Sequence, residues 1–246
     1  MNKIKNIYIS YWFKEMEYNP AIHVNELEKE VKSILDEPLM YNDEKVINNI
    51  SIPRIQGLSH DKKYFFTMSL VNAFLSININ EDISYDEAIL LINNDIQLFY
   101  DILKDIFDAK ILYSSIKVEL IDESKNAKDK LVKLLNLSKQ NYEDLSLKRG
   151  IIKDEYYINY ILTYSKEYNF NVTRNDNTTE QDLFDRSMIT SLSEAHLDKD
   201  FLLTIVEIND RYSYNIDKNY ETSKDNMRGM IIEIKEILNK EEYYEM

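Results

Sequence analysis

Cysteine is absent from this chain of 246 residues, and glycine and proline occur only three times each. Without cysteine the protein has no disulfide, no thiolate zinc site and no thiol nucleophile, which fits a reducing compartment. The three glycines are far apart, so no glycine-rich loop can bring several backbone N–H groups to a phosphate. The P-loop and the dinucleotide-binding fingerprint are therefore excluded.

Long apolar runs are also missing, because no window approaches the roughly 18 consecutive apolar residues of a membrane span. The first 13 residues contain no apolar run of signal-peptide length. We therefore expect a cytoplasmic protein that has no membrane partner.

The charge is strongly unbalanced, since 30 basic and 44 acidic residues give a formal net charge of −14 at pH 7. Such a chain has no long-range attraction to nucleic acid unless a local basic patch provides it. The densest lysines lie between residues 125 and 139, and they are typical of a solvated helix face. We expect no direct non-specific binding of nucleic acid. The 19 tyrosines reflect the amino-acid usage of an AT-rich genome and do not by themselves indicate a binding site.

The clearest pattern lies between residues 156 and 172, where apolar and polar side chains alternate. Tyr160 and Leu162 fall on one side of this pattern, and Asn159 falls on the other. Successive side chains of a strand point to opposite faces, so the pattern predicts a half-buried antiparallel strand. Its length exceeds the usual five or six residues, which predicts either a bend or a reversal near residues 165–167.

The same two periods predict most other elements. Ser84 and Glu87 form a capping box at the start of one helix. Residues 173–180 resemble a loop, and residues 40–51 show no clear period. Strands are predicted over 5–13, 52–58, 64–69, 73–79, 110–121 and 201–214, and helices over 24–35, 88–107, 124–137, 181–196 and 227–238.

This order of elements favours an α+β fold, in which long amphipathic helices pack on one face of an antiparallel or mixed sheet. Both halves of the chain contain two strands followed by a helix. This order suggests two similar halves, although their residues do not align. We expect a single compact body over 1–246. The alternative is a division into 1–137 and 150–246, with 138–149 as a polar connection.

Polar side chains interrupt the last apolar strand at residues 207–211. On a strand Glu207, Asn209 and Arg211 share one face, and Asp210 lies on the other. Such groups at a strand end can hold Mg²⁺ or a small anion, although a solvated surface ion network is commoner. Arg54 is a further candidate, because arginine is scarce beside lysine in this chain. We assign Arg54, Glu207, Asp210 and Arg211 as candidate binding residues, with no catalytic or metal-ligating residue.

The three histidines do not form a ligand pattern. His60 lies in a predicted turn beside Asp61 and could act as a general base, but an exposed turn residue is the simpler interpretation. The chain also lacks the nucleophile elbow, the zinc-protease motif and the calcium-binding loop.

These observations favour a non-enzymatic binding or interaction protein that acts through a sheet face or edge and through its helices. It would use a protein partner or self-association and no cofactor. One alternative is a metal-dependent hydrolase or nuclease that uses Glu119, Asp122, Glu207 and Asp210. A second alternative is an acidic mimic of nucleic acid, which is less favoured because lysines are interspersed among the carboxylates.

Overall fold

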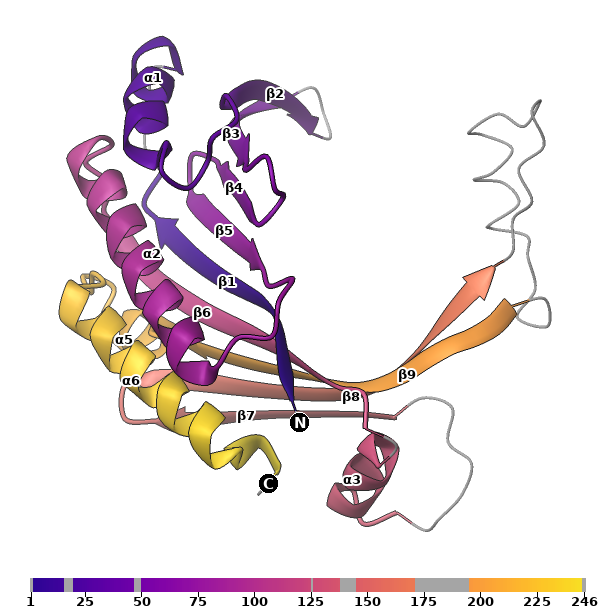
Figure 1. Cartoon of the computed structure of the whole chain (residues 1–246). Coiled ribbons are helices and arrows are strands. Elements are labelled where there is room, and N and C mark those ends of the chain that lie inside the picture. Colours follow the sequence, from indigo (N-terminus) through magenta and orange to yellow (C-terminus); the bar gives the residue numbers. More distant parts are fainter. Residues whose placement is uncertain are drawn as a thin grey trace, which may run out of the picture.

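A single nine-stranded antiparallel sheet organises the protein (Figure 1). The computed structural model describes residues 2–15, 20–46, 50–124, 126–137, 145–170 and 195–244. The strand order across the sheet is β2-β3-β4-β5-β1-β6-β9-β8-β7. The predicted α+β architecture is thus confirmed, with an antiparallel sheet. The strands are β1 (Lys3–Phe13), β2 (Met40–Val46), β3 (Ile50–Leu58), β4 (Tyr64–Met68), β5 (Asn72–Asn78), β6 (Ile111–Asp122), β7 (Leu145–Lys153), β8 (Tyr156–Phe170) and β9 (Ala195–Asn209).

Long helices cover one face of this sheet. In Figure 1, α2 and α6 lie side by side across its middle, and ion pairs between Lys224 and Asp101 (2.6 Å) and between Lys235 and Asp86 (2.8 Å) join them in antiparallel orientation. No helix of the described part is long and apolar enough to cross a membrane. The helices are α1 (Pro20–Val31), α2 (Tyr85–Asp105), α3 (Ala127–Leu134), α5 (Arg211–Ile216) and α6 (Lys224–Lys240), followed by the short 3₁₀ helix η3 (Glu242–Tyr244).

Local sequence signals explain where the long helices begin. The Ser84 side chain accepts a hydrogen bond from the backbone N–H of Glu87, whose carboxylate accepts one from the Ser84 backbone, so the predicted capping box is confirmed. Ser223 and Asn226 form the equivalent box at the start of α6. Each helix then places its apolar stripe on the sheet, which buries it in one continuous core.

Alternation also explains the two faces of the central strands. In β1 the side chains of Ile7, Ile9 and Tyr11 are buried under the helices, whereas Tyr8 and Trp12 point to the opposite face. The opposite face carries no long helix in the described structure (Figure 1), and we call it the open face. On this face the rings of Tyr8, Trp12 and Tyr113 are partly exposed.

Strand β8 confirms the period-two prediction, because Tyr160 and Leu162 are buried and Asn159 is only partly buried. The strand does not reverse near residues 165–167. It continues to Phe170 with a register shift between Glu167 and Tyr168, and beyond the rest of the sheet β8 and β9 pair only with each other. Figure 1 shows this part as a two-stranded ribbon that extends away from the sheet.

The structure differs from the sequence predictions at several places, and residues 211–214, expected in the last strand, belong to α5. Residues 40–46 are strand β2, and residues 145–149, expected in a polar connection, begin strand β7. Both are edge strands with one partner, so backbone pairing forms them without a strong side-chain period. The helix predicted over 181–196 lies mostly outside the described residues, as does the loop over 173–180, but residues 195–196 belong to β9.

Candidate functional site

The strand register aligns the open-face side chains into cross-strand rows. One row contains Tyr8, Lys117, Glu207 and Asn159, from β1, β6, β9 and β8. The next row contains Ser10, Ser115, Asn209 and Tyr157, and the third contains Trp12 and Tyr113. Directly opposed side chains lie about 5 Å apart, so residues that are distant in sequence become neighbours on this surface.

A cavity of about 430 Å³ opens on these rows, and we call it the open-face cavity. The rings of Trp12 and Tyr113 stack at one end with their centroids 4.7 Å apart. In the next row Ser115, which is only 4% exposed, pairs with Asn209, and Asn209 pairs with Tyr157. The cavity is lined by Trp12, Tyr113, Ser115, Tyr157, Asn159, Glu207, Asn209, Arg211 and Asn215.

Helix α5 forms the end wall of the cavity. Its first residue is Arg211, so Arg211 is not on the predicted strand, yet it still lines the same cavity as Glu207. Aromatic contacts attach α5 to the open face. The ring of Tyr212 lies edge-on to that of Tyr157 with the centroids 5.4 Å apart, and the ring centroids of Tyr214 and Tyr113 are 5.8 Å apart. Aromatic walls with a few polar groups are typical of ligand pockets.

The two charged groups of the cavity do not pair with each other. Glu207 accepts hydrogen bonds from the amides of Asn159 (3.2 Å) and Asn209 (3.5 Å), and within the described residues it forms no ion pair. Arg211 is exposed, and its guanidinium carbon lies 5.6 Å from the ring centroid of Tyr113. A partly buried carboxylate held by two amides retains a strong preference for a cation.

The neighbouring charges on the open face are already satisfied. Glu119 accepts hydrogen bonds from Asn6 (2.8 Å), Tyr8 (3.0 Å) and Lys117 (3.0 Å). Burial raises the pKa of Glu119, but the bonds from Asn6 and Lys117 outweigh it and lower this pKa below its ordinary value. Burial and the charge of Glu119 raise the pKa of Tyr8 to about 12. Lys117 lies 3.8 Å from the Tyr8 ring centroid, so this cluster is a closed network beside the cavity.

Asp210, a sequence-predicted site residue, lies apart from Glu207 and Arg211. It is fully buried on the helix side of the sheet, where its carboxylate accepts hydrogen bonds from the Ser114 backbone N–H (2.6 Å) and from the hydroxyls of Tyr220 (2.8 Å) and Thr222 (2.7 Å). Burial raises its pKa above the ordinary value, and these bonds partly offset that effect. Asp210 therefore ties the end of β9 to β6 and to the segment before α6.

Arg54 also lies away from the cavity, on β3 near the other end of the sheet. The sequence did not indicate Trp12, Tyr113, Tyr157 or Asn215. The alternation within each strand indicates which of its residues share a face, but only the order of the strands in the sheet shows that these residues lie together.

The carboxylates of the hydrolase alternative do not converge. Glu119 and Glu207 lie on the open face, but Lys117 is opposite Glu207 and forms an ion pair with Glu119. Asp122 forms an ion pair with Lys130 on the helix side. Within the described ranges, no three acidic or histidine side chains are grouped so that they could hold a metal ion. The arrangement gives the hydrolase alternative no structural support.

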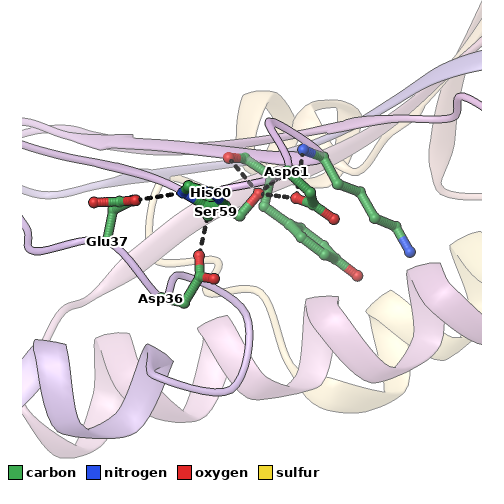
Figure 2. Close-up of polar contacts among 7 residues, drawn as sticks. Asp36, Glu37, Ser59, His60 and Asp61 are labelled. Carbon is green, nitrogen blue, oxygen red and sulfur yellow. Dashed lines mark hydrogen bonds and ion pairs between the residues drawn. The ribbon is translucent and has the colours of Figure 1, made fainter.

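His60 belongs to a polar turn between β3 and β4 (Figure 2). Its Nδ1 lies 3.0 Å from a carboxylate oxygen of Glu37, and its backbone N–H donates to Asp36 (2.6 Å). The hydrogen bond and the charge of Glu37 raise the pKa of His60, although its side chain is 83% exposed. Ser59 donates to Asp61 (2.6 Å) within the same turn. The contacts anchor the turn to the segment after α1, and His60 does not line the open-face cavity.

Comparison with models of protein families and with curated proteins finds no match for this chain. The geometry of the open-face cavity is therefore the principal guide to function.

Proposed function

We propose that this protein is a non-enzymatic binding protein, and that the open-face cavity is its ligand site. The observation that carries the proposal is a cavity of about 430 Å³ on the open face of the sheet, lined by aromatic rings, amides and two charges that form no ion pair with any described residue. This size lies within the range of small-molecule sites, roughly 300–1,000 Å³. The same volume can accept the end of a protein partner.

The character of the lining supports binding rather than turnover. Asn159, Asn209 and Asn215 offer hydrogen-bond donors and acceptors but no titration near neutral pH. Among the described residues, Glu207 is the single carboxylate of the lining and no histidine lines the cavity, so these residues provide no pair of a carboxylate and a histidine for acid and base catalysis. The proposal retains the cytoplasm as the compartment, because the chain contains no cysteine.

The only tryptophan of the chain, Trp12, lines the cavity and provides a specific reporter. We would incorporate 5-fluorotryptophan and screen a library of metabolites and short peptides by ¹⁹F NMR. Ligands of the cavity should shift the resonance of Trp12 and raise the melting temperature of the protein. The mixtures should contain no product after prolonged incubation.

A cavity-filling variant, Ser115→Phe, should lose these responses. Ser146→Phe is the matched control, because Ser146 is an exposed serine on the open face outside the cavity lining. If Ser115→Phe does not fold, Tyr157→Ala provides the second test, since it removes one wall. Ligands that bind all variants equally, or hits that are converted to product, would contradict the proposal.

A further inference from the structure

We propose that the open-face cavity binds a long basic residue that carries a free carboxylate, with the cation on Glu207 and the carboxylate on Arg211. This ligand chemistry belongs to free arginine or to an arginine at the carboxyl terminus of a chain. The inference deepens the proposed function and rests on it, because it names the ligand class of the same cavity.

Glu207 defines the cationic end of the ligand. Its carboxylate is held by the amides of Asn159 and Asn209, and within the described structure no cation pairs with it. Lys117 is its direct cross-strand neighbour, but Lys117 is bound to Glu119. Positioned amides that orient a carboxylate leave its remaining lone pairs for the N–H groups of a guanidinium, which forms bidentate bonds with such groups.

Arg211 defines the anionic end. Its guanidinium lies over Tyr113, in the row of Trp12, whereas Glu207 lies in the row of Lys117. Tyr113 and Lys117 are four positions apart along β6, which corresponds to roughly 13 Å at about 3.3 Å per residue. A ligand that contacts both groups therefore needs its charges well separated. Arginine with a free carboxylate has this property, and its guanidinium plane also suits the aromatic walls.

The charge of the whole protein favours this ligand over a nucleotide. A net charge of −14 attracts cations and repels phosphates at long range. In the described part of the chain, Arg211 is the single cationic side chain of the lining, which suits one carboxylate better than a phosphate group. A nucleotide remains the competing ligand to be tested, because the aromatic rings could also stack on a base.

The test is a titration followed by the fluorescence of Trp12. L-arginine should give saturable binding in about the millimolar range or tighter. Agmatine has the same cation without the carboxylate, and L-citrulline has a neutral group in place of the guanidinium. Each should bind about tenfold more weakly than L-arginine, because each loses one charged pair.

Two variants test the assigned residues. Glu207→Gln should weaken L-arginine about tenfold and leave L-citrulline almost unchanged, and Arg211→Gln should weaken L-arginine but not agmatine. The matched controls are Glu26→Gln and Arg149→Gln, which change exposed residues outside the cavity lining. Circular dichroism melts of all four variants check that the fold is retained.

The source of the ligand is decided with a peptide acetyl-Gly-Gly-Arg and its carboxyl-terminal amide. Tighter binding of the acid than of free L-arginine assigns the site to the end of a protein chain, and binding of L-arginine alone assigns it to the free amino acid. Three results would overturn this ligand assignment. Agmatine or L-citrulline could bind as tightly as L-arginine, the nucleotide GMP could bind more tightly than L-arginine, or the fluorescence of Trp12 could fail to respond to both L-arginine and the peptide acid. The broader library screen with Ser115→Phe then decides separately whether the cavity is a binding site.

Discussion

Replacing the buried aspartate of helix α2 should stabilise the protein, and the gain should depend on pH. Asp95 is 5% exposed, and its Oδ2 atom has no hydrogen-bond partner among the residues that the structure describes. Burial raises its pKa from 3.8 to about 6, with only partial opposition from the charge of Lys63. A shift of about two pKa units at roughly 1.36 kcal/mol each costs the folded state about 3 kcal/mol once the group is ionised.

The direction of the pH dependence of stability follows from proton binding to Asp95 in the folded and unfolded states. Below about pH 3.8 Asp95 is protonated in both the folded and the unfolded state, and its ionisation costs nothing. Between about 3.8 and 6 the unfolded chain loses its proton while the folded protein keeps it, so the free energy of unfolding falls as pH rises. Above pH 6 the full cost is present, and the neutral variant Asp95→Asn avoids it.

The measurement is urea unfolding of the wild type and of Asp95→Asn at pH 4, 6 and 8. We expect the variant to be more stable by up to about 3 kcal/mol at pH 8 and by less than about 1 kcal/mol at pH 4. Asp105→Asn is the control on the same helix, because Asp105 is exposed. A gain that is independent of pH, or a loss of stability at pH 8, would refute the reasoning.

Three further predictions concern the anchors of the fold. Asp210→Ala should lower the free energy of unfolding by about 3 kcal/mol or more, because it leaves three donors, two of them buried, without their acceptor, and urea unfolding will measure this. Gly57→Ala should cost about 1–3 kcal/mol in the same assay, since its new Cβ would lie 2.5 and 2.8 Å from two buried leucine side chains. Gly150→Ala is its milder counterpart, with 3.2 Å to the nearest side-chain atom, and an equal loss in both variants would contradict the packing argument. Glu37→Gln should lower the pKa of His60 in an NMR titration, because the hydrogen bond and the charge of Glu37 now raise that pKa. In the wild type the protonated ring stabilises the turn below about pH 6.5, and this stabilisation is lost as the pH rises through the pKa of the folded state. An unchanged titration of His60 would show that Glu37 does not hold it in solution.

Local patterns predicted those elements whose side chains alternate between core and solvent. In β8, Tyr160 and Leu162 had to face the core together, because a shift of one residue would place both in water. The capping box at Ser84 located the start of α2 for a similar reason, since its hydrogen bonds connect residues only three positions apart. The edge strand β7 gave a weak signal because it pairs on one side only.

The candidate site was predicted in part. Glu207 and Arg211 were recognised as polar groups at the end of an apolar strand, and they line one cavity. Asp210 precedes Arg211 directly and lies on the opposite, buried side, as the alternation of the strand implied. Its three hydrogen-bond partners come from β6 and from residues 220–222. No local pattern in the sequence could identify those partners.

Local sequence patterns were sufficient to predict the type and approximate extent of most helices and strands. Composition was sufficient to establish the acidic charge and to exclude cysteine chemistry and glycine-rich phosphate-binding loops. These properties depend on neighbouring residues or on composition, so they can be read without a fold. The shared cavity of Trp12, Tyr113, Tyr157 and Glu207 could be recognised only in the folded protein, because hydrogen bonding between strands distant in the chain sets their order and register. The cavity arises from that pairing, which is a property of the assembled sheet.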